Sequence, residues 1–324
     1  MLETSSSTRT VLAAAELWRC NADPLAIELD SAFYGGLDAL RNASDHADIA
    51  AGKGPIGQAV STGEPRVLTG FSEFGFLYQE AAQAAGLGGA AILPSFEQGR
   101  VTSVLVLYFR GGPSTVAAVE LWAGTKGRFE LSLDQSYYTG LERFARISRY
   151  VNFPKGSGLP GVCWDTALPR IVPHVAESKA FLRPVGEQDG GLTVGLGIPI
   201  MHRTELRGVF VALSSVNTPF ATVHEVWVED PQQPTQLIRA QGVYGGHVEL
   251  ARATDGMTFA TAGQEGLPGQ AWAAAQPLLL DGPDAILAAG SSRGDAFRDA
   301  GLAFALAIPV VVVDRVRAVV MLMG

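Results

Sequence analysis

Apolar and polar positions along the chain separate two kinds of extended segment. Residues 116–124 (VAAVELWAG) consist mainly of residues that favour strands, whereas residues 128–138 (RFELSLDQSYY) alternate apolar with polar side chains. Residues 191–202 and 205–215 are apolar at nearly every position and flank the polar pair Arg203-Thr204. We therefore predict four strands, of which the last two form a hairpin and are buried on both faces.

A glycine-rich motif stands between these two pairs of strands. Residues 156–161 read GSGLPG, and the apolar run that follows predicts a short helix over 161–167. Pro169 ends this helix, because its ring cannot continue the hydrogen-bonded turn. A short strand over 170–175 and a loop over 176–190 complete the predicted order of elements.

The whole pattern occurs three times. The segments AAAELW, AAVELW and TVHEVW end at Trp18, Trp122 and Trp227, which are 104 and 105 residues apart. Other landmarks recur in the same register: the turn residues Tyr34, Tyr138 and Tyr244, the motif glycines Gly57, Gly161 and Gly269, and the prolines Pro65, Pro169, Pro277, Pro94, Pro199 and Pro309. Such repetition predicts one structural unit used three times, with the tryptophans in its core.

Short joins mark where one unit ends and the next begins. They read RGGPST near residue 112 and VNTPF near residue 218. We place unit 1 at 1–112, unit 2 at 113–216 and unit 3 at 217–324.

The composition predicts a globular protein with an extensive core, because 47% of the 324 residues are hydrophobic and 17% are charged. The N-terminal MLETSSSTRT is polar, which predicts no signal peptide, and no apolar run reaches the roughly 18 residues of a membrane span. Cys20 and Cys163 are too few for a disulfide framework or a cysteine-rich zinc site. We expect a cytoplasmic protein without a membrane partner.

Charge is unevenly distributed over the units. The chain has a net charge of −8, and unit 2 alone is positive, with 11 Lys and Arg against 9 Asp and Glu. Binding to nucleic acid requires clustered positive charge on a scale that this composition does not provide. We expect no nucleic-acid partner.

The glycine motif invites comparison with dinucleotide-binding loops, because residues 52–57 and 156–161 match G-x-G-x-x-G. A dinucleotide site requires an apolar strand directly before the motif, within a βαβ unit. The residues before the unit 1 motif, SDHADIAA, are polar, and unit 3 breaks the pattern at Gln264. We interpret the motif as an architectural part that forms a tight turn and starts a helix, whose N-terminus can hold an anion.

Recognisable catalytic or metal-binding motifs are missing from the sequence. The histidines do not stand at metal-ligand spacing from one another, from cysteine or from carboxylates; they are His46, His174, His202, His224 and His247. The sequence contains no nucleophile elbow, zinc-protease motif or phosphate-binding loop. We expect no metal, no covalent cofactor and no catalytic activity.

The order of elements and the string FPKGSGLPGVCWDTALPRIV (153–172) resemble the GAF domain, which often has a Phe-Pro-Lys-Gly lead, Gly-Leu-Pro-Gly, an apolar helix and a proline before the next strand. Unit 3 keeps Gly-Leu-Pro-Gly at 266–269 and Trp272, whereas unit 1 has the looser Gly-Pro-Ile-Gly at 54–57. The resemblance covers nearly the whole chain. It implies an α+β fold of three tandem GAF-like units, each a mainly antiparallel sheet with short helices on one face.

Many GAF domains also have helices that cover the back of the sheet, and the short joins of this chain leave no room for them. We therefore predict that the three sheet backs pack together in a pseudo-threefold arrangement. Homo-oligomers that cover these backs between molecules are the alternative.

The GAF resemblance implies a small-molecule-sensing or regulatory module in signal transduction. Neither the Cys-His pair of bilin-binding members nor the N-K-x-F…D-E pattern of cyclic-nucleotide-binding members is present. One alternative is a structural or partner-docking scaffold with degenerate pockets. Another is an enzyme of the methionine sulfoxide reductase type, which needs two thiols within reach, whereas Cys20 and Cys163 belong to different units. We expect no catalytic or DNA-binding output after unit 3 and therefore expect a partner protein to carry the signal.

Unit 2 is the predicted place for a ligand, because it keeps the fullest motif and carries the positive net charge. We expect a small anionic ligand. The predicted anion-binding residues are Arg143, Arg146, Arg149 and Lys155, and the pocket that the resemblance implies is lined by Trp164, Arg170, His174, Phe181 and Arg183. The alternative is that the three helix-spaced arginines pair with acidic units 1 and 3, and that Trp164 belongs to the core.

Overall fold

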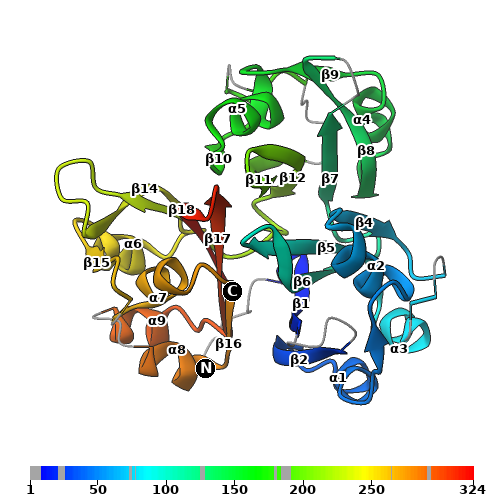
Figure 1. Cartoon of the computed structure of the whole chain (residues 1–324), viewed down its shortest axis with the longest axis horizontal. Coiled ribbons are helices and arrows are strands. Elements are labelled where there is room, and N and C mark those ends of the chain that lie inside the picture. The colour runs from blue at the N-terminus through cyan, green and yellow to red at the C-terminus, as the bar shows by residue number, and fades with distance from the viewer. Residues whose placement is uncertain are drawn as a thin grey trace, which may run out of the picture.

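The computed structural model describes residues 9–20, 26–72, 75–76, 78–124, 128–178, 181–183, 191–263, 265–289 and 293–324. Three antiparallel sheets of six strands lie around a common centre, and Figure 1 shows unit 1 in blue to cyan, unit 2 in green and unit 3 in yellow to red. Gln264 and most of the predicted loop after Ser178 lie outside the described residues.

The three sheets share one topology, in which the first and last strands of a unit pair at the centre. The first sheet, in the order β3-β2-β1-β6-β5-β4, contains β1 (Leu12–Cys20), β2 (Ala26–Phe33), β3 (Ile49–Ala50), β4 (Arg66–Thr69), β5 (Leu87–Glu97) and β6 (Arg100–Arg110). The second, β10-β11-β12-β7-β8-β9, contains β7 (Ala117–Gly124), β8 (Glu130–Thr139), β9 (Asn152–Pro154), β10 (Arg170–Pro173), β11 (Leu192–His202) and β12 (Glu205–Ser215). The third, β15-β14-β13-β18-β17-β16, contains β13 (Val223–Glu229), β14 (Gln236–Val243), β15 (Thr258–Ala260), β16 (Leu278–Asp281), β17 (Phe304–Val312) and β18 (Arg315–Met323).

Short helices accompany each sheet. They are α1 (Asp38–Ser44), α2 (Gly54–Thr62) and α3 (Gln79–Ala84) in unit 1, α4 (Glu142–Ser148) and α5 (Gly158–Thr166) in unit 2, and α6 (Val248–Thr254), α7 (Leu267–Ala274), α8 (Pro283–Ala288) and α9 (Gly294–Asp299) in unit 3. Within the described residues, no helix has both the length and the apolar character that a bilayer span requires.

The repeat predicted from the sequence is confirmed at the level of strands. Trp18, Trp122 and Trp227 lie on β1, β7 and β13, which occupy equivalent places in the three sheets. A register shift directly before each tryptophan interrupts the pairing with the following strand. The predicted hairpin at Arg203-Thr204 joins β11 to β12. The α+β class with antiparallel sheets is therefore the fold of this chain.

The glycine motif starts α2, α5 and α7, as predicted. A Cβ on Gly57 or Gly161 would overlap the carbonyl oxygen of Ala50 or Pro154, and a Cβ on Gly269 would lie 2.7 Å from the carbonyl oxygen of Ala260. These carbonyls belong to the short strands β3, β9 and β15. Only glycine lets the helix approach the short strand so closely.

Some short elements were not predicted. Helix α4 has seven residues, of which Phe144 and Ser148 are buried, so its apolar pattern is too short to recognise. Strand β9 has three residues and is held by its pairing with β8.

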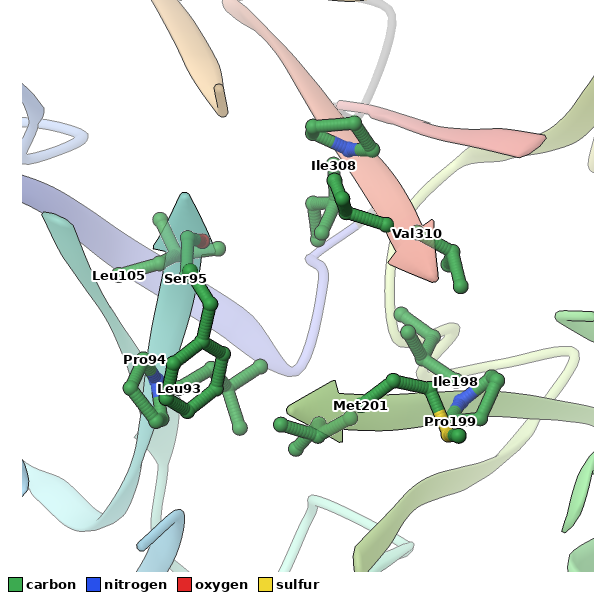
Figure 2. Close-up of a pocket in the computed structure, with 13 residues that line it drawn as sticks. Leu93, Pro94, Ser95, Leu105, Ile198, Pro199, Met201, Ile308 and Val310 are labelled. Atoms are coloured by element: carbon green, nitrogen blue, oxygen red, sulfur yellow. The ribbon is translucent and has the colours of Figure 1, made fainter. Parts of the chain in front are cut away.

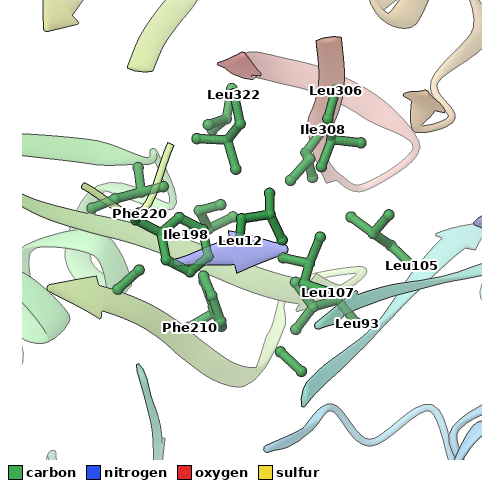
Figure 3. Packing of buried hydrophobic residues seen from close by; sticks show 14 of the residues in the cluster. Leu12, Leu93, Leu105, Leu107, Ile198, Phe210, Phe220, Leu306, Ile308 and Leu322 are labelled. Carbon is green, nitrogen blue, oxygen red and sulfur yellow. The ribbon is translucent and has the colours of Figure 1, made fainter. Parts of the chain in front are cut away.

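The inner faces of the sheets share one buried hydrophobic cluster. Its members come from all three units, and Figure 3 shows Leu107 of unit 1, Phe210 of unit 2 and Leu322 of unit 3 among the converging side chains. The helix-covered outer faces form three separate clusters, one in each unit. Each sheet is thus buried on both faces, which explains why its closing strands are apolar throughout.

In each unit the fourth strand packs on the second strand of another unit. Strand β4 packs on β8, β10 packs on β14, and β16 packs on β2. In the first two contacts a glutamine side chain of the second strand accepts a backbone hydrogen bond, from Val67 N to Gln135 Oε1 at 2.7 Å and from Ile171 N to Gln241 Oε1 at 2.8 Å. Ser31 stands at the equivalent position of β2. The pseudo-threefold arrangement stays a prediction that these pairings support.

Candidate functional site

Each unit buries a glutamate under its helices. Glu16, Glu120 and Glu225 stand two residues before the repeated tryptophans, and their exposed fraction is 0%. The tryptophan Nε1 donates a hydrogen bond to the glutamate Oε2 at 2.9, 2.9 and 2.8 Å, respectively. Sequence reasoning missed this carboxylate, although an acidic residue repeated within three apolar strands was an available signal.

The turn tyrosines complete part of the shell around each carboxylate. The hydroxyl groups of Tyr34, Tyr138 and Tyr244 donate to the glutamate Oε1 of their own unit at 3.1, 2.6 and 2.7 Å. Burial, followed by the charge of Glu225, raises the pKa of Tyr244 to about 12, and the same causes raise the pKa values of Tyr34 and Tyr138 further. The phenols therefore remain protonated donors at neutral pH.

In units 2 and 3 an arginine neutralises the buried glutamate. Arg183 Nη1 donates to Glu120 Oε1 and, at 2.8 Å, to Ser148 Oγ. Arg293 Nη1 donates to Glu225 Oε1 at 2.7 Å and to Thr254 Oγ1 at 2.9 Å. Aromatic rings surround both guanidinium groups; they are Trp122, Phe144, Phe153 and Phe181 for the first, and Trp227, Phe259 and Phe297 for the second.

Unit 1 surrounds its glutamate with hydroxyl groups. Tyr78 and Tyr108 each donate to Glu16 Oε2 at 2.8 Å, and Ser44 donates to Glu16 Oε1 at 2.7 Å. Burial and the charge of Glu16 raise the pKa of both tyrosines well above the ordinary value. Five donors, counting Trp18 and the turn tyrosine, thus bind one buried carboxylate.

The described residues leave little open space beside the helices of units 1 and 3. A cavity of about 10 Å³ lies beside Arg293 in unit 3, and another of about 10 Å³ lies beside Lys53 and Tyr78 in unit 1. Each has at most the volume of one water molecule. These two inner pockets are therefore closed to a metabolite.

The structure brings only some of the predicted unit 2 pocket residues together. Phe181 and Arg183 are in contact, with the guanidinium carbon 5.2 Å from the ring centroid. Trp164 lies at the edge of the unit core, whereas Arg170 and His174 are exposed on and after β10. Arg183 is 2% exposed and bound to Glu120, so this part of the predicted lining faces an internal carboxylate.

The predicted anion-binding residues lie on the surface of unit 2. Arg143 and Arg146 are exposed on α4, and Arg149 is the C-cap residue of the same helix. Lys155 Nζ lies 3.7 Å from Asp165 Oδ1 and 5.8 Å from the centroid of the Trp164 ring. The anion site at these residues stays a prediction.

A larger hollow, which we call the junction cleft, lies between units 1 and 2. Its volume is about 600 Å³. It is lined by Cys20, Val60, Ser61, Thr62, Gly63, Phe96, Gly99, Arg100, Val101, Thr102, His202 and Arg207. The lining combines two arginines, a histidine and three hydroxyl groups with no Asp or Glu side chain. Sequence reasoning missed this site, because its residues come from five separate segments of two units.

Polar groups of unit 2 have fixed positions in the junction cleft. Arg207 Nη2 lies 2.9 Å from His202 Nδ1, and Nη1 of the same guanidinium donates to Glu64 Oε1 at 3.0 Å. Because the arginine is a donor, His202 Nδ1 is the acceptor, and its Nε2 donates to the carbonyl oxygen of Gly99 at 3.1 Å. Arg100 is exposed and has no hydrogen-bond or ion-pair partner among the described residues.

A small apolar cavity of about 40 Å³ lies at the centre of the molecule, and Figure 2 shows residues of units 1, 2 and 3 around it. The repeated Pro94, Pro199 and Pro309 line it, and a register shift follows each proline by one residue. Proline within a sheet is tolerated at such irregularities. With one polar residue, Ser95, in its lining, this cavity has no groups that would orient a polar ligand.

Neither cysteine is activated. Burial raises the pKa of Cys163 to about 12 and also raises the pKa of the half-buried Cys20, so both thiols stay protonated at neutral pH. Among the described residues, no cluster of three or more His, Cys, Asp and Glu side chains is arranged to hold a metal.

The fold defines the class of the molecule as α+β: the chain consists of three tandem units with one six-strand antiparallel topology, which is the arrangement that the GAF resemblance predicts. No protein-family model and no curated protein matches the sequence. Among solved structures, the nlh2 GAF domain of A. aeolicus matches with 23% identity over 31% of this chain and 58% of its own, and a TM-score of 0.25. The match thus spans less than two thirds of that protein.

Two further solved structures match over a similar share of the chain. An NreA protein from Staphylococcus aureus that is mutated in its nitrate binding site has 15% identity over 31% of this chain and 75% of its own, with a TM-score of 0.25. A type II free methionine-R-sulfoxide reductase from Thermoplasma acidophilum has 13% identity over 33% of this chain and 65% of its own, with a TM-score of 0.24.

Proposed function

We propose that the chain is a cytoplasmic small-molecule-sensing or regulatory module without a catalytic output, and that it receives its ligand in the junction cleft. The observation that carries this proposal is a hollow of about 600 Å³ with cationic and hydroxyl groups on its walls. Ligand pockets typically have volumes of roughly 300–1,000 Å³ and a few well-placed polar groups. The two free cysteines agree with a reducing compartment.

The chemistry of the junction cleft favours a small polar molecule with an acidic group. Arg100 offers a guanidinium without a partner, and Ser61 and Thr102 offer hydroxyl groups. The ring of Phe96, which lies 4.9 Å from that of His202, supplies an apolar wall. A ligand held here touches two units at once and therefore favours one relative position of them.

The units in this proposal are those predicted from the sequence, 1–112, 113–216 and 217–324. The six strands of each sheet fall within one of these ranges. The segments between β6 and β7 and between β12 and β13 are short, which agrees with boundaries near residues 112 and 216.

Binding to the junction cleft is tested by filling it. Thr62 lines the cleft near the C-terminus of α2, and Thr166 occupies the equivalent place in α5; each Oγ1 donates to the carbonyl oxygen four residues earlier at 2.9 Å. Native mass spectrometry and an absorption spectrum of freshly purified protein show whether a ligand is bound, and a metabolite screen by thermal shift identifies ligands. We expect Thr62→Trp to abolish binding and the matched control Thr166→Trp to keep it. Binding that survives Thr62→Trp would contradict the proposal.

The second candidate function is a partner-docking scaffold, and the filled inner pockets favour it. The space beside Arg293 and the space beside Tyr78 leave no room for a metabolite. In this case the exposed basic residues Arg146 and Arg149 of unit 2 would contact an acidic partner protein. A protein that binds no metabolite in the screen, but loses a co-purifying partner on Arg146→Glu with Arg149→Glu, would support the scaffold over the sensor.

A further inference from the structure

A second hollow lies where unit 1 meets unit 3, away from the junction cleft. Its volume is about 290 Å³. The two units are joined beside it by backbone hydrogen bonds, from Val11 N to Pro219 O at 2.8 Å and from Leu12 N to Phe220 O at 3.0 Å. The rings of Phe33 and Phe304, with centroids 4.6 Å apart, form part of its wall.

Two arginines of unit 1 face this hollow, and neither makes an ion pair within the described residues. Arg110 Nε donates to the carbonyl oxygen of Thr10 at 3.1 Å, and the terminal nitrogens of its guanidinium have no partner among the described residues. Arg9 is exposed and makes neither a hydrogen bond nor an ion pair within the described part of the chain. No Asp or Glu side chain belongs to the lining, and unit 3 adds the polar side chains of His247 and Thr222. Gly324, which also lines the hollow, accepts a hydrogen bond from Phe304 N at 2.9 Å through its oxygen.

The proximity of the two guanidinium groups is unfavourable without an anion. Burial lowers the pKa of Arg110, and the positive charge of Arg9 lowers it further. The chain has a net charge of −8, whereas the two arginines make this hollow locally positive. An anion between them would replace this repulsion by attraction to both.

We propose that this hollow is an anion-binding site, in which Arg9 and Arg110 hold the carboxylate or phosphate group of a small molecule. A guanidinium presents paired N–H donors whose geometry matches both oxyanions. The volume limits the ligand to a small compound, and the phenylalanine rings offer contact to its apolar part. Because unit 1 supplies the arginines and unit 3 the opposite wall, a bound anion stabilises the contact between these units.

The test uses the whole chain with inorganic phosphate and acetate as separate probes, at constant ionic strength. Millimolar phosphate, acetate or both should raise the Tm of the wild-type protein, and the anion with the larger effect identifies the preferred oxyanion. Arg9→Gln and Arg110→Gln should weaken binding about tenfold or more, because each removes a charged hydrogen-bonding partner. Arg315→Gln, at an exposed arginine outside the hollow, serves as the matched control and should bind as the wild type does.

The Arg9→Gln variant keeps the test decisive, since Arg9 is exposed and makes neither a hydrogen bond nor an ion pair within the described part of the chain. Without anion this variant should be at least as stable as the wild type, because the repulsion between the arginines is removed. An equal Tm gain in the wild type and in Arg9→Gln, or no gain in the wild type with either anion, would overturn the inference. Thr62→Trp should leave the phosphate response unchanged, which separates this site from the junction cleft.

Discussion

At the scale of single residues, the three buried glutamates show that a carboxylate at one repeated position can obtain its hydrogen-bond donors in two ways. Glu120 and Glu225 each receive one arginine, whereas Glu16 receives hydroxyl groups in its place. An ionised carboxylate without water needs such donors, because its desolvation costs several kcal/mol. The same need explains why Arg183, which the GAF resemblance places in the lining of a ligand pocket, faces inward.

Replacement of Arg183 should be strongly destabilising. Arg183→Gln removes the cation beside Glu120, and we expect the free energy of unfolding to fall by about 3–5 kcal/mol, as is usual when one partner of a buried ion pair is lost. The measurement is chemical denaturation. Arg170→Gln, at an exposed arginine of the same unit, should change the value by less than about 0.5 kcal/mol. Adding Glu120→Gln to Arg183→Gln should restore part of the loss, and a loss no larger than that of Arg170→Gln would contradict this account.

At the scale of elements, the glycine motif is a packing device that sets a helix on a short strand. Gly161 has no side chain where α5 passes the Pro154 carbonyl oxygen of β9, so the strand and the helix are in direct backbone contact. Helix α5 then buries Leu159 and Cys163 against the sheet.

A single methyl group should disturb this contact. Gly161→Ala places a Cβ on the carbonyl oxygen of Pro154, and we expect a loss of stability of about 3 kcal/mol, since overpacking forces the backbone apart. Gly124→Ala is the matched control, because its Cβ would meet nothing within 4 Å. Thermal unfolding of the two variants gives the comparison; equal Tm values would show that the close approach is unimportant.

Strand β13 differs from its counterparts in one inward-facing residue. His224 stands where unit 1 has Ala15 and unit 2 has Val119, which belong to the shared central cluster. It is 1% exposed, lies between Val243 and Leu322, and has no hydrogen-bond partner for either ring nitrogen within the described chain. Burial lowers the pKa of His224 from 6.5 to about 4.

This histidine should make stability depend on pH. Above the unfolded-state pKa of 6.5 both states are neutral and the contribution of His224 to stability is complete. As the pH falls from 6.5 to about 4, the unfolded chain takes up a proton that the folded chain does not, and the free energy of unfolding falls by about 3 kcal/mol. We expect His224→Leu to remove this part of the pH dependence, as followed by urea denaturation. The exposed His174→Leu should leave it in place; an unchanged profile for His224→Leu would contradict the expectation.

At the scale of the whole molecule, the central cluster makes the three units depend on one another. Each sheet buries its back against the other two, so a unit on its own would expose an apolar face. The contacts of β4 with β8, β10 with β14 and β16 with β2 join every unit to both others. The pseudo-threefold packing predicted from the short joins stays a prediction, which these contacts support.

The chain should therefore unfold as one cooperative body. We expect a single calorimetric transition whose calorimetric and van't Hoff enthalpies agree. Phe210→Ala, at a fully buried position of the central cluster, should lower the stability of the whole chain by about 3–5 kcal/mol without splitting the transition. Separate transitions for the units, or an elongated small-angle scattering profile of the monomer, would show that the units are independent.

The sequence by itself determined the repeat and the meaning of the glycine motif, and its resemblance to the GAF domain implied the class of fold. These follow from local rules: Trp18, Trp122 and Trp227 keep one register, apolar runs predict buried strands, and glycine is required where backbones meet. Short elements such as α4 escaped prediction, because seven residues hold too few periods of an apolar pattern. The strands and the glycine turn could be predicted, because the residues that specify each of them lie within a few positions of one another.

Only the tertiary structure decided where open sites lie. Glu120 and Arg183 are 63 residues apart in the sequence, and no spacing indicates that one will neutralise the other inside unit 2. The junction cleft joins Arg100 of unit 1 to Arg207 of unit 2, and the hollow between units 1 and 3 joins Arg110 to unit 3. Such sites arise where whole units pack together. The relative positions of the units depend on the burial of the apolar faces of all three sheets, which no local motif encodes.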